Sequence, residues 1–302
     1  SPFILKAKIL LQELWRLNYD WDQEIEEKMQ NHWEKWIEGA KKVSKIALGR
    51  QYITDDRPIS EVQLHIFCDA SEMAYGCVAY IRFTFKTGDH MCAFVMAKSR
   101  LAPIKTMTLP RLELNAAQIG ARMARLIVHE IDFPIERIQY WSDSALTLQY
   151  IKNTNNRMKV FVANRVTEIL ELSSADQWNH VPGAQNPADV LSRGVIDPKK
   201  LTSGSWFTGP KFLLEDEENW PSRLIEDLSP DEVEIKRKSI LVGMEVVKTS
   251  GIDMTRFSNW LRLKRVVAWM IRFLRNCRCD RKDRTFGCLT LEEITEAQIQ
   301  IV

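Results

Sequence analysis

The sequence predicts an α/β fold built on a mixed five-stranded sheet with flanking helices, extended by helical segments at both ends. Two observations support this class. Three consecutive segments rich in β-branched and aromatic residues predict an antiparallel meander, and two further strand-like segments then alternate with helical ones. The composition, 45% hydrophobic and 27% charged, is typical of a soluble globular protein. The net charge is only +2, so any surface for a polyanion must be local.

Residues 3–48 precede the sheet and are predicted to be helical. A first helix carries apolar residues from Ile4 to Leu14, and a second begins near Asp22 with acidic residues in its first turn, where they complement the helix dipole. The segment Gly49–Ser60 is predicted to be a connector. The chain has no initiator methionine, so we expect a piece of a longer polypeptide.

The hydrophobic period changes to two at Val62, which predicts a strand ending at Asp69. A second strand is predicted over Tyr75–Phe85 and a third over His90–Met96, with a turn signal between them. Thr108 is the expected N-cap of a long helix that reaches about Glu130. The remaining elements are a strand at Arg137–Trp141, helices at Ser144–Lys152 and Val160–Leu172, and a strand at Gln177–Val181.

The composition changes after Gly194. Glycines, prolines and an acidic run over residues 197–234 indicate a linker. Residues 254–284 hold ten Lys and Arg against two Asp, and Trp260–Leu274 keeps helical spacing. This basic helix is expected either to bind nucleic acid electrostatically or to pack through its apolar stripe. The expected domains are residues 1–59 (helical), 60–196 (sheet), 197–253 (acidic linker) and 254–302 (basic helical segment).

Four acidic residues occupy positions that structure alone explains poorly. Asp69 and Asp143 each end an apolar strand, where a carboxylate costs free energy unless it is paired or bound to metal. Ligands of α/β sheets gather at these carboxyl ends. Glu113 lies in the first turns of the long helix, whose small residues allow a close approach to the sheet. Asp189 begins a short helix and is suited to capping it. Each acid alone is more often solvated or capping; together they predict one site.

Four segments resemble the ribonuclease H region of BEL/Pao-type retrotransposon polyproteins, a domain family labelled Pao retrotransposon peptidase. They are Phe67–Ser71, Thr108–Leu114, Trp141–Ser144 and His180–Gly194. The opening Lys6–Trp15 is similar to the stretch that follows the polymerase in those polyproteins, and the basic C-terminal helix is similar to the stretch before their integrase.

This resemblance implies an RNase H-like fold and hydrolysis of the RNA strand of RNA–DNA hybrids. Two Mg²⁺ or Mn²⁺ ions would be held by Asp69, Glu113, Asp143 and Asp189. The implied partners are the hybrid and the adjoining polymerase and integrase parts, with no membrane. The implied location is intracellular, in a cytoplasmic virus-like particle with access to the nucleus. Candidate nucleic-acid contacts are Arg193, Arg157 and Lys159, with Arg165 as a further one; a solvated helix face explains most of them as well.

Alternatives from other classes remain. An aspartic peptidase needs an Asp-Thr/Ser-Gly loop, and Asp69-Ala70-Ser71 lacks the glycine. An integrase core places its glutamate last, whereas Glu113 stands between two aspartates. A catalytically inactive or host-adopted module for nucleic-acid binding or scaffolding stays open, because the loop before Asp189 carries no histidine and His180 is more often structural than a proton shuttle.

Overall fold

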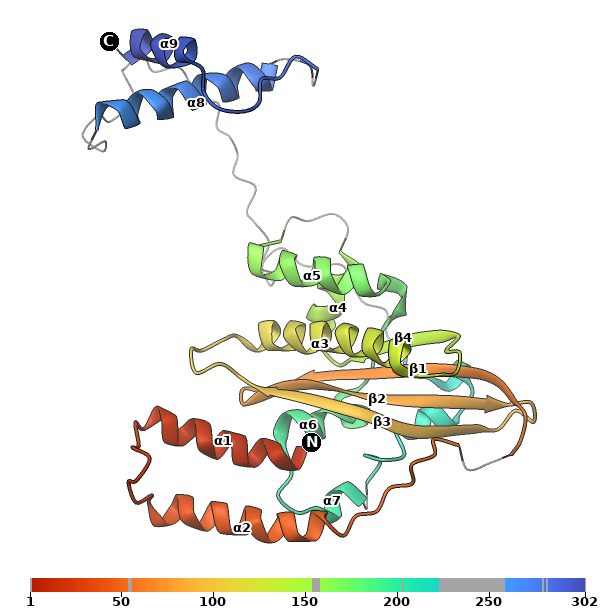
Figure 1. Cartoon of the computed structure of the whole chain (residues 1–302). Helices are drawn as coiled ribbons and strands as arrows, with labels where there is room; N and C mark the ends of the chain where they lie inside the picture. Colours follow the sequence, from red (N-terminus) through yellow and green to blue (C-terminus); the bar gives the residue numbers. More distant parts are fainter. Residues whose placement is uncertain are drawn as a thin grey trace. The chain divides into compact units, whose positions relative to one another are not determined.

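A five-stranded sheet forms the centre of the first part of the chain (Figure 1). The computed structural model describes residues 2–53, 56–153, 158–202, 204–222, 259–278, 280 and 282–301. The strands are β1 (Ile59–Ala70), β2 (Ala74–Phe85), β3 (His90–Leu101), β4 (Arg137–Ser142) and β5 (Trp178–His180). Their order in the sheet is β3-β2-β1-β4-β5. The predicted mixed five-stranded sheet is therefore confirmed.

The pairing of the strands brings two chain segments together at one edge. β1 pairs antiparallel with β2, and β2 pairs antiparallel with β3, as a meander requires. β1 pairs parallel with β4, and β4 with β5. The last register pair of β1 and β4 is Cys68 with Ser142. Asp69 and Asp143 come directly after that pair, so they lie on neighbouring strands at the same end of the sheet.

Helices cover both faces of the sheet (Figure 1). The α-helices are α1 (Pro2–Arg16), α2 (Glu27–Val43), α3 (Leu109–Glu130), α4 (Ala145–Lys152), α5 (Val160–Leu172), α6 (Ala188–Arg193), α7 (Lys199–Thr202), α8 (Trp260–Arg278) and α9 (Leu291–Ile301). Short 3₁₀ turns are η1 (Ala175–Gln177), η2 (Gly183–Gln185), η3 (Lys211–Leu214) and η4 (Glu217–Asn219). α3, α4 and α5 lie on one face, and α6 and α1 on the other. Among these described helices, none is long and apolar enough to cross a membrane.

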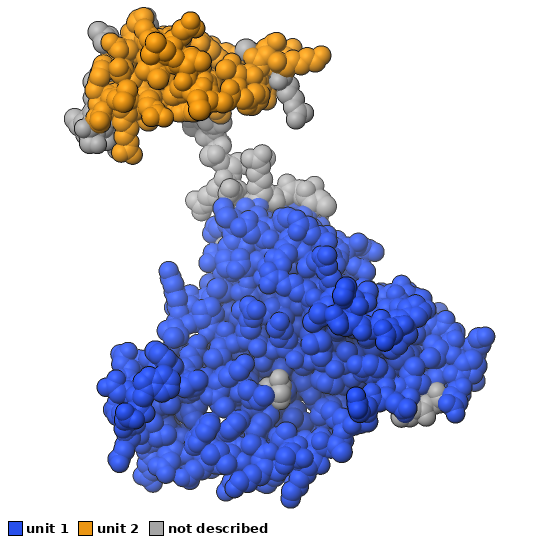
Figure 2. Space-filling view, in the orientation of Figure 1, with its two compact units in different colours: residues 1–239 blue, residues 240–302 orange. Residues whose placement is uncertain are grey.

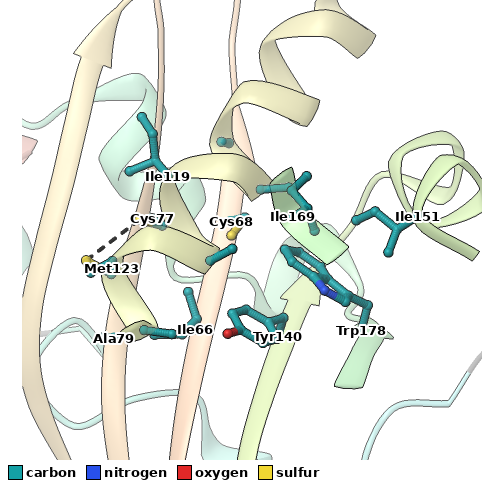
Figure 3. Packing of buried hydrophobic residues seen from close by; sticks show 14 of the residues in the cluster. Ile66, Cys68, Cys77, Ala79, Ile119, Met123, Tyr140, Ile151, Ile169 and Trp178 are labelled. Carbon is teal, nitrogen blue, oxygen red and sulfur yellow. Dashed lines mark hydrogen bonds between the residues drawn. The ribbon is translucent and has the colours of Figure 1, made fainter. Parts of the chain in front are cut away.

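Tight packing between α3 and β1 fixes the position of the long helix (Figure 3). The small residues Ala116, Ala117 and Ala124 are fully buried, as their spacing predicts. Gly120 lies closer still, because a Cβ atom added there would lie 2.5 Å from Cys68 Sγ and 3.1 Å from Ile66 Cγ2. α3 therefore sits lower on the sheet than any helix with a side chain at residue 120 could.

Gly120→Ala is expected to destabilise the protein by about 1–3 kcal/mol, because the added methyl group must displace Cys68 or raise the helix. The same change should lower any activity that depends on Glu113, which α3 carries. Urea unfolding checks the first effect. Arg125→Gly, at an exposed position of the same helix, is a control for helix propensity. If Gly120→Ala unfolds at the same urea concentration as wild type, the close approach of α3 to β1 at this residue is contradicted.

The second face of the sheet is covered by α6 and by residues 204–222. Phe67, Tyr80 and Trp141 point to this side and pack with buried Phe212 and Leu213. The sequence predicted a linker here, because the segment is rich in glycine, proline and acidic residues. The structure differs: the aromatic residues of this segment complete a second hydrophobic core, and their irregular spacing shows no period.

The chain divides into two compact units, residues 1–239 and 240–302 (Figure 2). The sheet and all elements up to η4 belong to the first. In the second, α8 and α9 pack against each other around a small core of Leu263, Val267, Ala268 and Ala297.

Candidate active site

Two aspartates lie side by side at the carboxyl end of β1 and β4. Asp69 lies one residue before the end of β1, paired with Gly76 of β2, and is only 7% exposed. Asp143 follows β4 directly and is half-buried. Their negative charges act on each other, since the charge of Asp143 contributes to raising the pKa of Asp69. The first two predicted site residues are therefore neighbours in space.

Glu113 reaches the same edge from α3. It is held by Ser144, whose hydroxyl donates to Glu113 Oε2 and accepts from the Thr147 backbone N–H at 3.1 Å, capping α4. The charge of Asp143 also acts on Glu113 and raises its pKa. The close packing at Gly120 thus delivers a third carboxylate to the strand ends.

Asp189 comes from the opposite side of the sheet, on α6. This short helix can approach because Gly76 has no side chain; a Cβ there would lie 2.9 Å from Leu191 Cδ2 and 2.3 Å from the carbonyl oxygen of Lys98. The Ser192 hydroxyl, on the same helix, donates to Asp69 Oδ2. Asp189 itself accepts from Arg193 Nε at 2.5 Å. Its charge contributes to raising the pKa of both Asp69 and Asp143.

Burial and the repulsion between neighbouring carboxylates raise the pKa values of Asp69, Glu113 and Asp143. Burial is the largest cause for Asp69, Glu113 and Asp143, and it raises the pKa of Asp69 to about 7. It also raises the pKa of Glu113 and of Asp143 above their ordinary values. The hydrogen bonds from Ser192 and Ser144 act in the opposite direction but do not cancel it. The four acids thus form one electrostatic cluster, in which Arg193 pairs with Asp189.

The loop before α6 closes one side of the cluster. Asn186 is buried, donates to the Cys68 carbonyl oxygen at 3.0 Å, and hydrogen-bonds to Asp143. A Cβ atom at Gly183 would lie 3.2 Å from Asp143 Oδ2, so this glycine lets the loop backbone pass close to the carboxylate. His180, at the end of β5, is near enough for its charge to lower the pKa of Asp143.

Comparison with known proteins finds a family that is similar to the first part of the chain. The model of the family described as Pao retrotransposon-like RNaseH-like domain matches residues 1–144. Residues 1–144 are thus similar to the proteins of that family. The resemblance predicted from the sequence is confirmed over this range. The match includes Asp69, Glu113 and Asp143 and ends before Asp189.

Solved structures similar to this chain include three ribonucleases H. RNase H1 from the archaeon Halobacterium salinarum is 18% identical, with 44% of this chain and 94% of that chain covered and a TM-score of 0.30. The N-terminal RNase H domain of a Mycobacterium tuberculosis protein is 14% identical, with 48% and 100% covered and a TM-score of 0.31. LC11-RNase H1 in complex with RNA/DNA hybrid is 12% identical, with 43% and 93% covered and a TM-score of 0.31. No curated protein matches the chain.

The side chains predicted to contact nucleic acid fall in different places around this RNaseH-like domain. Arg193 is exposed and paired with Asp189, so it lies at the rim of the acidic cluster. Lys159 is exposed immediately before α5. Arg157 lies outside the described residues.

An arginine pair near Glu113 is a feature that the sequence did not single out as a pair. Arg111, two residues before Glu113, lies 4.8 Å from the centroid of the Phe161 ring, and Arg165 lies 3.4 Å from it. The positive charge of Arg111 helps to lower the pKa of Arg165, although burial is the larger cause. The contacts of these two guanidinium groups with one ring join α3 to α5, which no local pattern could reveal.

Sequence reasoning also missed the residues that hold the carboxylates. Ser192, Ser144 and Asn186 each hydrogen-bond to one of the four acids. For Ser192 a signal existed, because it stands three residues after Asp189 and therefore on the same side of α6. Asn186 had none, since its partners Cys68 and Asp143 are far away in sequence.

The donor chemistry of the RNaseH-like domain fits a hard divalent cation. The four acids offer only carboxylate oxygens, the ligands that Mg²⁺ and Mn²⁺ prefer, and the charges of Asp143 and Asp189 act together with burial to raise the pKa of Asp69. Across the described ranges, however, no three His, Cys, Asp or Glu side chains are arranged to hold one metal ion. Ser192, Ser144 and Arg193 each engage one oxygen of a carboxylate, so a metal ion would bind the other oxygen or displace these side chains.

Proposed function

We propose that the domain at residues 60–196 hydrolyses the RNA strand of RNA–DNA hybrids. The observation that carries this proposal is the electrostatic cluster of Asp69, Glu113, Asp143 and Asp189, gathered from β1, α3, the end of β4 and α6. The family match, which includes the first three of these acids, supports the same reaction class. A group of four carboxylates, of which Asp69 is buried and the other three are partly buried, favours binding of divalent cations over any chemistry of a lone acid.

Each acid has a proposed role as a ligand of Mg²⁺ or Mn²⁺. Asp69 and Asp143 would bind from the strand ends, Glu113 from α3 and Asp189 from α6. When bound, two such ions would activate water and neutralise charge on the phosphodiester. Ser144 would keep Glu113 oriented towards the cluster. Arg193 would exchange its ion pair with Asp189 for a phosphate of the substrate.

Hybrid recognition is proposed to use basic groups at the rim of the cluster. Arg193 lies at the rim of the acids, where a phosphate would pass. Lys159 and the Arg111–Arg165 pair, at α3 and α5, would contact phosphates farther along the hybrid. Contacts to RNA 2′-hydroxyls in the minor groove would distinguish a hybrid from DNA. LC11-RNase H1 was solved with an RNA/DNA hybrid, and we extend that ligand class to this chain as a proposal.

The family match also supports a place in a retroelement polyprotein. We propose that polymerase and integrase parts adjoin this chain there and are its partners during reverse transcription. A location in cytoplasmic virus-like particles, with access to the nucleus, belongs to the same proposal.

A hybrid-cleavage assay tests the proposed activity. A 5′-labelled RNA strand annealed to DNA is incubated with the full chain and Mg²⁺, Mn²⁺ or excess chelator, and products are separated on a gel. We expect cleavage of the RNA strand with either metal and none with chelator. The same RNA annealed to RNA, and the same DNA annealed to DNA, should stay intact. An intact hybrid with both metals, despite normal hybrid binding, would contradict the nuclease.

A binding module without turnover is the second candidate. The observation in its favour is that Ser192, Ser144 and Arg193 engage the carboxylates and that the described residues offer no ready metal site. Such a module would bind the hybrid with equal affinity in Mg²⁺ and in chelator. Hybrid affinity measured in both conditions, beside the cleavage assay, separates the two candidates.

A further inference from the structure

The basic residues of α8 divide into two sets, and one set is neutralised by α9. The side of α8 that faces α9 buries Leu263 and Val267. On this side Arg272, only 4% exposed, donates to both carboxylate oxygens of Glu293 and to the carbonyl oxygens of residues 287 and 288. Arg275 forms a single, more exposed ion pair with Glu296. These contacts fix the orientation of α8 and consume the acids of α9 that face it.

The opposite side of α8 carries positive charge beside exposed aromatic rings. Arg262, Arg265 and Trp269 are three to four residues apart, and Phe273 continues the row, so all four share one side of the helix. Trp269 is 47% exposed and Phe273 is 67% exposed. Neither Arg262 nor Arg265 forms an ion pair with an acid of the described ranges. This outer face is therefore a set of uncompensated cations interleaved with rings.

A hollow lies on this outer face. It has a volume of about 530 Å³. The residues that line it are Asn259, Leu261, Arg262, Arg265, Val266 and Trp269. The lining thus offers two guanidinium groups, one amide and the side of an indole, and it contains no acid. Arg272 lies 4.7 Å from the centroid of the Trp269 ring, which holds the indole in place while nearly half of its surface stays open.

We propose that this outer face of α8 is a binding site for single-stranded nucleic acid, separate from the acidic cluster of the first unit. Arg262 and Arg265 would contact successive phosphates, and an unpaired base would stack on Trp269. Charge complementarity selects a polyanion, because the acids nearby are already paired with Arg272 and Arg275. The exposed rings select a single strand, because only unstacked bases offer a face for stacking on an aromatic side chain.

Fluorescence anisotropy of the full chain with a labelled single-stranded oligonucleotide tests the site, in chelator so that no strand is cut. Arg262→Glu combined with Arg265→Glu should weaken binding at least tenfold. It should also reduce the slope of log affinity against log salt by about 1.4, for two phosphate contacts. Trp269→Ala should weaken single-strand binding by about tenfold and leave duplex binding unchanged, because a duplex offers no free base.

Lys41→Glu combined with Lys42→Glu on exposed α2 changes the net charge equally and should bind as wild type. Circular dichroism checks that α8 remains helical. Wild-type affinity in both α8 variants would overturn the site. Two other results would also overturn it, if oligonucleotide binding stays intact in the α8 variants. Loss of a dimer that the wild type forms would assign the face to a second copy of the chain. Loss of binding to anionic phospholipid vesicles would assign it to a membrane. The hybrid-cleavage result does not enter this test, so the two proposals fail independently.

Discussion

Asp69→Asn is expected to abolish hybrid cleavage and, at the same time, to stabilise the metal-free protein above neutral pH. The loss of cleavage should be at least about a thousandfold, because a missing charge at the metal ligands costs several kcal/mol of transition-state stabilisation. The gain in stability has a separate cause. Asparagine keeps the shape of the side chain but removes a carboxylate that burial and two neighbouring acids disfavour.

The direction of the pH effect follows from the raised pKa of Asp69. In the folded protein this pKa is about 7, against an ordinary value of 3.8. Protonated Asp69 therefore favours the folded state fully below pH 3.8, and this contribution is lost as the pH rises from there through about 7. The loss amounts to about 2–4 kcal/mol for the metal-free wild type. Glu113 and Asp143 change in the same direction.

Urea unfolding in chelator at pH 4 and at pH 8 measures this effect. Wild type and Asp69→Asn should unfold at closer urea concentrations at pH 4, and the variant should be more stable at pH 8. Mg²⁺ at pH 8 should restore the wild type and leave the variant unchanged, since a bound ion stabilises only the state that binds it. Asp132→Asn, at an exposed position, is the matched control. Equal stability of wild type and Asp69→Asn at pH 8 would contradict the raised pKa of Asp69.

Local patterns were sufficient to predict the sheet and the places of the acids. Strand periodicity is a property of a few adjacent residues, so β1, β2 and β4 were predicted close to their observed bounds. The acids at the ends of β1 and β4 could be predicted to lie close together because neighbouring parallel strands end at one edge of the sheet. The run of small residues around Gly120 likewise predicted the close approach of α3. Their roles as metal ligands stay a proposal.

Long-range partners could not be predicted in this way. Gln63 and His65 alternate with apolar residues, as in a strand with one polar face, yet both are completely buried. Their cover is the 204–222 segment, more than 130 residues away along the chain, which looked like a linker. Trp220 of that segment packs edge-on against His65, with ring centroids 5.3 Å apart. A polar pattern on a strand does not say whether water or another part of the chain will meet it.

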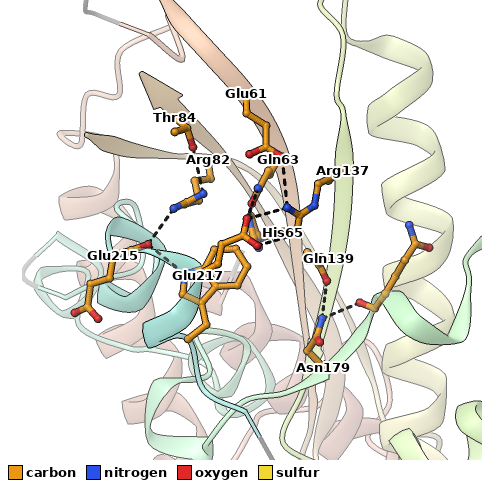
Figure 4. Close-up of polar contacts among 12 residues, drawn as sticks. Glu61, Gln63, His65, Arg82, Thr84, Arg137, Gln139, Asn179, Glu215 and Glu217 are labelled. Atoms are coloured by element: carbon orange, nitrogen blue, oxygen red, sulfur yellow. Dashed lines mark hydrogen bonds and ion pairs between the residues drawn. The ribbon is translucent and has the colours of Figure 1, made fainter. Parts of the chain in front are cut away.

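Arg82 of β2 is the main link between this segment and the sheet (Figure 4). Its side chain is 1% exposed. Nε donates to the Leu213 carbonyl oxygen at 2.8 Å and Nη2 to that of Glu215 at 2.9 Å. The guanidinium group also lies 5.0 Å from the centroid of the Trp220 ring. A single buried guanidinium group thus contacts two backbone carbonyl groups and one indole ring of the 204–222 segment.

Arg82→Ala is expected to destabilise the first unit by about 3 kcal/mol or more, because it leaves buried carbonyl groups without a donor and opens a cavity beside Trp220. Limited proteolysis should then cut within residues 204–222, which wild type protects. Arg137→Ala is the matched control: it removes an arginine whose ion pair with Glu217 is more exposed, and should cost less than about 1 kcal/mol.

Since the 204–222 segment and the loop before α6 line one cavity of about 820 Å³, Arg82→Ala should also loosen that loop and slow hybrid cleavage. Wild-type protection of residues 204–222 in Arg82→Ala would mean that the aromatic residues alone hold this segment on the sheet.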